Sequence, residues 1–448
     1  MENLHSRQRR TFARELAATQ TTAIIPSGTL KTRNADCEYR FRPDSDFWYL
    51  TGFREPDSVL VLLPGPDTDA PAEARSVLFL RDKDTQREIW TGRRLGVQAA
   101  PGALGIDQAF PIDDLWERLP ELLVGRERIA SRPGVDTEFD ARLAELLDLL
   151  RTSVSKNVRP PLELGDCGAL LHGQRLVKSE AELERMRTAA SISARAHSAA
   201  MAAARPGIGE NEIEALLDYH FRRSGGNGAA YTSIVAGGAN ACILHYIENE
   251  VPLADGDLLL IDAGAEFDYY ASDVTRTFPV NGTFTPDQRA LYEVVLGAQE
   301  HAIDAVRPGG TLDGVHQTAL EVLVDGLIEL GLLRSTRDQA IQDGSYRRFY
   351  MHKTSHWLGL DVHDCSARAR REAPQTLEPG MVLTVEPGLY VADDDETVEA
   401  RWRGIGIRIE DDVLVTEDGR EVLTEAIPKS VDDVEAACRT GASLASIP

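Results

Sequence analysis

The chain has 448 residues, which is long for a single hydrophobic core and favours two domains. Apolar residues make up 42% and charged residues 27% of the sequence, as is usual for a globular protein in water. The formal net charge of −24 argues against a nucleic-acid or anionic-membrane partner, because phosphate groups are bound by basic surfaces, but it is compatible with binding cations.

No targeting or membrane segment is expected. The first ten residues are polar, and no apolar segment follows them, so they do not resemble a secretory signal. No run approaches the roughly 20 apolar residues that cross a bilayer. The five cysteines are scattered without a C-x-x-C pair, which is typical of reduced thiols. These features predict a cytoplasmic protein.

Residues 1 to about 160 alternate strand and helix signals, which predicts an α/β N-terminal domain. Strands are expected in three β-branched or leucine-rich runs bounded by proline and glycine, at Thr22–Pro26, Ser58–Leu63 and Ser76–Arg81. Helices are expected where apolar residues recur at helical spacing, at Asp113–Leu123 and Thr137–Arg151. The Pro160-Pro161 pair and the polar stretch after it mark a linker, and we place the boundary between residues 172 and 173.

Two capping boxes predict long helices in the second domain. Ser179 and Glu182 can satisfy each other's backbone amides, so a helix is expected from there to about Ala204. The segment Thr285–Gln288 repeats this arrangement with proline at the first helical position, and predicts a helix to about Val306. A Pro-Gly pair follows each helix. Each half of this domain thus has helices followed by a strand that carries an acid.

Those two acid-bearing strands read as copies of each other. In Gly256–Gly264 and again in Gly380–Gly388, a glycine opens an apolar strand, an acid follows six positions later, and a second glycine stands two further on. The acids are Asp262 and Glu386. Because an unpaired carboxylate in an apolar setting is costly, the repeat predicts a duplicated domain whose halves direct acids at one shared cation.

A further acid is expected opposite Asp262. If the chain forms a hairpin that turns at Phe267-Asp268, Asp262 and Asp273 face each other about 5 Å apart and need a cation between them. The alternative is that the turn lies elsewhere and Asp273 is a surface residue. The neighbours Val274 and Phe278 favour a half-buried strand.

The segment Gly404–Glu410 alternates strictly between isoleucine and other residues. Its isoleucines point to one side, so that Gly406, Arg408 and Glu410 point to the other. Glu410 then faces inward beside a charge partner, and Gly406 leaves room for a ligand. The alternative is an exposed strand with an Arg–Glu ion pair.

Three histidines, His352, His356 and His363, fall close together in the sequence, which is unusual for structural histidines. One of them can be a metal ligand, and the other two could orient a substrate or move protons. His245 is a weaker candidate, since a lone histidine is more often structural.

The candidate ligands are four carboxylates and one imidazole. That set is too rich in oxygen for structural zinc, and it suits two divalent ions such as Mn²⁺, with Co²⁺, Zn²⁺ or Fe²⁺ possible. Four carboxylates also balance the charge of two dications. A water that bridged such ions would deprotonate readily and become a nucleophile.

The order Asp262, Asp273, His356, Glu386 and Glu410 resembles the metal set of the pita-bread metallopeptidases, which include methionine aminopeptidase, prolidase and aminopeptidase P. The surrounding segments are similar to those of bacterial aminopeptidase P, and the likeness spans almost the whole chain. These segments are Ile261–Gly264, Asp273–Pro279, Ser355–Asp364, Gly404–Glu410, Arg33–Asp36 and Ser45–Phe53. The resemblance implies an α+β protein: an N-terminal α/β domain (residues 1–172) for oligomerisation and substrate access, then a pita-bread catalytic domain (residues 173–448) with an internal pseudo-twofold duplication.

The resemblance also implies roles. His356 would be the imidazole ligand, and Glu410 would bridge the metals. His352 and His363 would hold the substrate carbonyl and the tetrahedral intermediate, while His245 would contact the proline side. Arg408 would orient a metal carboxylate and link to Asp36 in a proton path. Tyr231 and Trp90 match positions that line the site.

The implied activity is release of the N-terminal residue from peptides with proline in the second position, by attack of a metal-bridging hydroxide. A prolidase, which cleaves Xaa-Pro dipeptides, would use the same metal set. A non-catalytic pita-bread binding module is a third alternative, but such modules usually lose metal ligands, and all five are present here. The resemblance also implies a homodimer or homotetramer. The basic segment Cys365–Arg371 departs from the family pattern and puts the shape of the substrate subsite in doubt.

Overall fold

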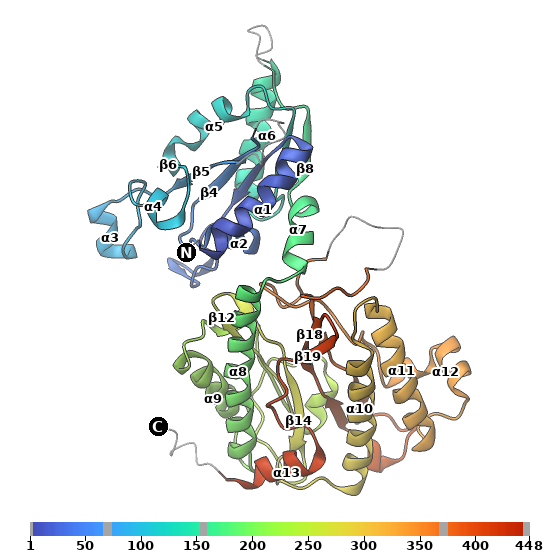
Figure 1. Ribbon diagram of the computed structural model, residues 1–448. Coiled ribbons are helices and arrows are strands. Elements are labelled where there is room, and N and C mark those ends of the chain that lie inside the picture. The colour runs from blue at the N-terminus through green and yellow to red at the C-terminus, as the bar shows by residue number, and fades with distance from the viewer. Residues whose placement is uncertain (1–2, 66–73, 153–158, 367–374, 442–448) are drawn as a thin grey trace. The chain divides into compact units, whose positions relative to one another are not determined.

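The computed structural model describes residues 3–65, 74–152, 159–366 and 375–441 (Figure 1). The chain divides into two compact units, residues 1–174 and 175–448, so the division falls two residues after the predicted boundary. None of the described helices combines the length and the hydropathy that a membrane span requires.

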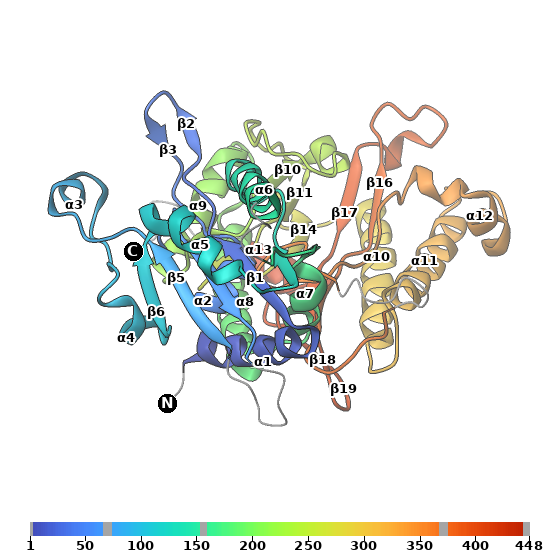
Figure 2. The same cartoon turned by 90° about the horizontal axis from the view of Figure 1, so that it is seen from above.

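The N-terminal unit is a three-layer α/β sandwich. Its six-stranded sheet has, in spatial order, β6 (Gln108–Pro111), β5 (Arg75–Leu80), β4 (Val59–Leu63), β1 (Thr21–Pro26), β7 (Arg128–Ser131) and β8 (Glu163–Asp166). The sheet is mixed, because β1 pairs antiparallel with β4 and parallel with β7. Figure 2 shows α5 (Leu115–Leu123) and α6 (Thr137–Thr152) on one side of the sheet and α1 (Leu4–Thr19) on the other. Burial of apolar side chains on both faces explains why its central strands are almost continuous hydrophobic runs.

The predicted elements of this unit are confirmed with small changes. The ends of the three predicted strands each fall within one residue of the ends of an observed strand. A 3₁₀ turn (Ile112–Asp114) forms the start of the first predicted helix. The sequence did not single out several shorter elements. These are α2 (Ser45–Thr51), α3 (Thr85–Thr91), α4 (Ala100–Leu104), the hairpin β2 (Thr32–Asn34) with β3 (Cys37–Glu38), and α7 (Gly168–Leu176).

The C-terminal unit contains the same sequence of elements twice. In each half two packed helices precede four strands, of which the first pairs with the fourth and the second with the third. The first half has α8 (Glu180–Ala203), α9 (Glu210–Arg223), β11 (Leu258–Asp262), β12 (Ala265–Phe267), β13 (Tyr270–Ala271) and β14 (Thr275–Pro279). The second half has α10 (Pro286–Ala305), α11 (Leu312–Glu329), β15 (Val382–Val385), β16 (Gly388–Val391), β17 (Ile405–Arg408) and β18 (Asp411–Thr416). Figure 1 shows the strands between the two helix pairs, as the predicted duplication requires.

Other elements extend these halves. Strand β10 (Ile234–Gly237) pairs with β11, β9 (Gly228–Ala229) pairs with β12, and β19 (Gly419–Val422) pairs with β18. Helix α12 (Arg337–Asp343) follows α11, and α13 (Val431–Arg439) packs beside α8. Both predicted capping boxes are present, at Ser179 and at Thr285, and they fix where the two long helices begin.

The predicted hairpin pairing is wrong by two residues. Asp262 lies opposite Thr275, not opposite Asp273, and the turn is at Asp268-Tyr269. Both turn residues have positive φ, 48° and 66°, as a two-residue turn of type I′ requires. Aspartate tolerates this backbone region, and the sequence offered no glycine to mark it.

Candidate active site

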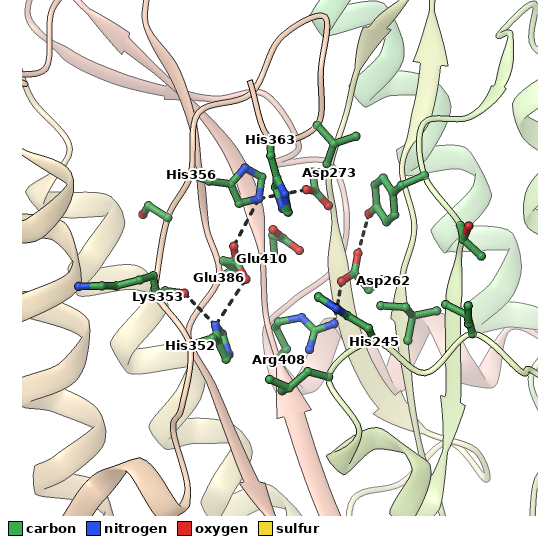
Figure 3. A pocket seen from close by; sticks show the side chains of 17 residues that line it. His245, Asp262, Asp273, His352, Lys353, His356, His363, Glu386, Arg408 and Glu410 are labelled. Carbon is green, nitrogen blue, oxygen red and sulfur yellow. Dashed lines mark hydrogen bonds and ion pairs between the residues drawn. The ribbon is translucent and has the colours of Figure 1, made fainter. Parts of the chain in front are cut away.

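All five predicted metal ligands line one cavity of about 460 Å³ in the C-terminal unit (Figure 3). The predicted residues His245, His352, His363, Arg408 and Tyr231 line the same cavity. The carboxylates enter it where strands are interrupted: Asp262 ends β11, Asp273 lies between β13 and β14, Glu386 follows β15, and Glu410 follows β17. Figure 3 shows Asp262 and Asp273 on one side of Glu410, with Glu386 on the other.

A glycine makes room beside Asp273. Backbone hydrogen bonds from Ala263 to Val274 and from Ser272 to Ala265 continue the ladder, so Gly264 lies opposite Asp273. A Cβ atom at Gly264 would collide with the carbonyl of Ser272. In this register Asp262 and Asp273 share a face as diagonal neighbours, which is still within reach of a common ligand. The second glycine of the predicted repeat is therefore needed for the close approach of the two strands.

The positions of the donors fit a cation. Asp273, His356 and Glu410 can each offer one ligand atom, and these atoms lie within 4.8 Å of one another. The Nε2 atom of His356 is 3.4 Å from Asp273 Oδ2 and 3.5 Å from Glu386 Oε1. Atoms that each lie about 2.1 Å from one ion are separated by similar distances.

The carboxylates raise one another's pKa. Burial, and then Asp273 and Glu386, raise the pKa of Glu410 well above its usual value. Burial and Asp273 raise the pKa of Glu386 to about 7 against the opposing effect of His356. A cavity that holds so many buried acids is electrostatically unfavourable until cations balance them, so the residues present fit divalent metal ions.

Arg408 gives one of the acids a fixed partner. Its guanidinium donates to Asp262 Oδ2 at 2.7 Å, to the Tyr390 hydroxyl at 2.9 Å and to Thr275 Oγ1 at 3.0 Å. The hydroxyl of Tyr231 donates to the other oxygen of Asp262 at 2.6 Å. Asp262 is thus held by two donors, and its orientation toward the cavity is fixed.

Two residues of this network, Thr275 and Tyr390, were not predicted. Thr275 donates to Glu410 Oε2 at 2.6 Å, and Tyr390 connects Arg408 to His352. Thr275 lies in the segment Asp273–Pro279 that the sequence had marked, whereas Tyr390 lies in β16, which directly follows the second Gly-strand-acid repeat. Thr275 lies two positions after the predicted ligand Asp273, so on a strand both side chains face the same side. This spacing could have identified Thr275 from the sequence.

The three remaining histidines differ in how they are held. The Nδ1 atom of His352 is 2.8 Å from the Lys353 carbonyl, and its Nε2 atom is 2.9 Å from the Tyr390 hydroxyl. A carbonyl only accepts, so Nδ1 donates and Nε2 accepts from Tyr390. Burial and Arg408 lower the pKa of His352 to about 4, so this ring is neutral. His352 is therefore engaged on both sides by protein groups.

His245 and His363 are exposed at the cavity. The ring of His363 packs edge-on against His356 with 4.3 Å between centroids, and burial together with His356 lowers its pKa. Within the described part of the chain, no hydrogen bond holds the ring of His245. These two rings are available to a bound ligand.

Asp36 and Trp90 lie in the N-terminal unit. Both side chains are exposed, Trp90 with 87% of its surface, and their predicted roles stay predictions. Most of the predicted subsite segment Cys365–Arg371 lies outside the described residues.

Comparisons with known proteins identify the family of this chain. Residues 184–417 match the model of metallopeptidase family M24, and residues 5–130 match that of the aminopeptidase P N-terminal domain. The chain is 44% identical to the Xaa-Pro aminopeptidase of Escherichia coli over 93% of each chain, and 42% identical to that of Haemophilus influenzae over 97% of this chain and 96% of the relative.

Solved structures show the same likeness. The aminopeptidase PepP of Pseudomonas aeruginosa superposes with a TM-score of 0.92, at 47% identity over 97% of each chain. A zinc-substituted Escherichia coli aminopeptidase P in complex with product superposes with a TM-score of 0.93, at 43% identity over 97% of this chain and 98% of that one. The chain therefore belongs to metallopeptidase family M24 and, within it, to the Xaa-Pro aminopeptidases.

Proposed function

We propose that the protein removes the N-terminal residue from peptides that have proline in the second position. The observation that carries this proposal is the convergence of four carboxylates and one imidazole on a single cavity, with His245 and His363 exposed beside them. The 44% identity to a relative named Xaa-Pro aminopeptidase supports proline in the second position.

The cavity would hold two divalent metal ions, and we infer Mn²⁺ because the donors are mostly oxygen with a single imidazole. Their proposed ligands are Asp262, Asp273, His356, Glu386 and Glu410. Metal ions held by these residues would supply a bound water of lowered pKa that is nucleophilic near neutral pH.

The protein's own side chains would do the positioning. Arg408 and Tyr231 hold Asp262 from two directions, so this carboxylate cannot turn away from the cavity. His363 is neutral and exposed, and its N–H can donate to the oxygen that gains charge when the substrate carbonyl becomes tetrahedral. His245 approaches from a separate loop and would contact the proline side. The free amine of the substrate would bind a metal or one of the acids, which would restrict cleavage to N-termini.

For His352 we propose a different role from the one that the resemblance implies. Because both of its ring nitrogens are bonded within the protein, we propose that it orients Tyr390 and, through it, Arg408. A contact of His352 with the substrate carbonyl would require these bonds to break.

The test is a panel of peptides with the Mn²⁺-loaded protein. Cleavage of a tripeptide such as Ala-Pro-Ala with release of alanine, and no cleavage of Ala-Ala-Ala, is the expected result. Activity on Ala-Pro alone would identify a prolidase instead. No cleavage of any Xaa-Pro peptide by protein whose two metal equivalents are confirmed by elemental analysis would overturn the proposal.

We also infer a homodimer or homotetramer in the cytoplasm. Ile89 and Trp90 on the short helix α3 are 80% and 87% exposed, and adjacent exposed large apolar residues often mark protein contacts. The five cysteines are all free, which suits a reducing compartment. Light scattering of purified protein and fractionation of cells test these two inferences.

A further inference from the structure

One loop of the C-terminal unit brings three residues to the cavity. The loop runs over residues 238–251, between β10 and β11, and places Leu244, His245 and Ile247 in the cavity lining. His245 itself forms no hydrogen bond with any described residue. The position of its ring is therefore set by the backbone of the loop.

A buried carboxylate holds this loop. Glu210, in the first turn of α9, has none of its surface exposed. Each of its two oxygens accepts two hydrogen bonds from the loop or its ends. Oε1 accepts from the Gly237 amide at 2.8 Å and the Asn240 side chain at 3.1 Å, and Oε2 accepts from the Tyr246 hydroxyl and the Val251 amide, both at 2.9 Å.

The four donors cover the whole loop. Gly237 and Val251 stand at its two ends, Asn240 at its start, and Tyr246 directly after His245. Among the described residues Glu210 forms no ion pair, so its charge is compensated by these donors and by the N-terminus of α9. A buried charge without a cation is expensive to keep, which indicates that the four bonds have a purpose beyond general stability.

A second buried residue completes the attachment. Asn249 adopts a positive φ of 50°, and its side chain accepts from the Val235 amide and donates to the Ser233 carbonyl, both at 2.9 Å. This residue ties the end of the loop to β10. Of Glu210 and Asn249, it is Glu210 that bonds the side chain of Tyr246, the immediate neighbour of His245.

We propose that Glu210 is a positioning residue that sets the place of His245 in the active site. The proposal rests on the proposed function, because it assumes that His245 contacts the substrate. Glu210 does not touch the cavity, so its effect on turnover passes through the loop. A displacement of a substrate-contacting group by about 1 Å can lower the rate about 100-fold.

The experiment is a double-mutant cycle with Glu210→Gln and His245→Ala. Glutamine keeps the shape of the side chain but has only one acceptor oxygen, so two of the four bonds are lost. Glu210→Gln is expected to lower kcat/KM on a Xaa-Pro tripeptide about tenfold or more, with bound metal unchanged. In the His245→Ala background the same change should alter kcat/KM by less than about twofold, because the residue that it positions is absent.

Glu212→Gln is the matched control. Glu212 lies in the same helical turn, is exposed, and among the described residues accepts only from the Gly209 amide. The kcat/KM of Glu212→Gln should therefore stay within about twofold of that of the wild type. If Glu210→Gln is too unstable to purify, Tyr246→Phe removes a single donor and should cause a smaller loss that also vanishes in the His245→Ala background.

The outcomes separate the two proposals. Wild-type protein that fails to cleave Xaa-Pro peptides contradicts the proposed function. If the wild type cleaves them, two results overturn only the role of Glu210. One is an unchanged kcat/KM in Glu210→Gln, and the other is a loss of kcat/KM from Glu210→Gln that is just as large in the His245→Ala background.

Discussion

Arg408 donates a hydrogen bond of 2.7 Å to Asp262, and the two residues come from opposite halves of the duplicated unit. Arg408 lies opposite Gly388 in the second half, as Asp273 lies opposite Gly264 in the first. The same position of the repeat thus carries an acid in one half and a cation in the other. By the same register Glu410 corresponds to Thr275, and these two residues are hydrogen-bonded to each other.

Replacing Arg408 with methionine should abolish most of the turnover but keep the metal. Asp262 would lose its charged partner, and the Tyr390 hydroxyl would lose its donor. The site would become more negative by one charge, so its attraction for cations would grow rather than fall. We expect kcat/KM to drop about 100-fold on an Ala-Pro peptide, with the metal content by elemental analysis unchanged. Loss of metal together with activity would contradict this role for Arg408.

Glu410→Gln should have opposite effects on the metal-free and metal-loaded protein. Burial and three neighbouring acids raise the pKa of Glu410, so its charged form destabilises the metal-free cavity. We expect the melting temperature in chelator at pH 7.5 to rise by roughly 1–2 °C, which corresponds to about 1 kcal/mol when each residue contributes about 2.1 cal/mol/K to the unfolding entropy.

The loaded protein should behave differently, because Glu410 is a proposed ligand. Glu410→Gln should bind at least one metal equivalent less, and its melting temperature with Mn²⁺ should fall below that of the wild type. The exposed Glu417→Gln is the control for the loss of one negative charge. Two bound metal equivalents in Glu410→Gln would remove this residue from the ligand set.

The residue types and spacing in the sequence located the site, but the contacts within it required the structure. The Gly-strand-acid repeat and the alternation of Gly404–Glu410 depend on strand periodicity alone, and Ile405, Ile407 and Ile409 indeed pack in the core. The hairpin register was missed because the turn residues Asp268 and Tyr269 carry no glycine. An error of two residues kept Asp273 on the correct face, since side chains alternate with period two.

Long-range contacts could not be predicted from the sequence for a different reason. Tyr390 and Glu210 act through partners that are distant along the chain, and nothing in the local pattern indicates which partner a polar side chain will meet. The same holds for His352, whose two hydrogen bonds decide whether it can reach a substrate.

Lys178→Met should destabilise the loop that carries His363. Asp364, the next residue, has a side chain that is 1% exposed and is bonded to Lys178 at 3.1 Å and to Arg175 at 2.6 Å. Both cations lower the pKa of Asp364 against the effect of burial, so this carboxylate is charged. Removing one buried cation should cost about 3 kcal/mol in the free energy of unfolding. Arg289→Met, which breaks an exposed pair with Glu293, should change it by less than about 0.5 kcal/mol.

The same variant tests whether the pair positions His363. We expect Lys178→Met to lower kcat/KM about tenfold at a temperature where circular dichroism shows it fully folded. Full activity of the folded variant would limit the Lys178–Asp364 pair to a structural role.

His197 should make the protein less stable in mild acid. It is fully buried on α8, its Nε2 atom lies 2.8 Å from the Ala263 carbonyl, and its Nδ1 atom has no partner among the described residues. Burial lowers its pKa from 6.5 to about 4. Between these values the unfolded chain binds a proton that the folded protein does not, so stability falls as the pH falls. The loss should be about 2 kcal/mol at pH 5 and roughly 3 kcal/mol at pH 4.

His197→Gln isolates this contribution, because the buried carboxylates titrate in both proteins and cancel in the difference. With both proteins in chelator, the wild type should lose melting temperature relative to His197→Gln as the pH is lowered from 7.5 to 4.5. The melting temperature of the exposed control His301→Gln should change with pH as that of the wild type does over the same range. If the melting temperature of His197→Gln falls with pH as that of the wild type does, His197 is protonated in the folded protein. Its Nδ1 atom must then donate to an acceptor.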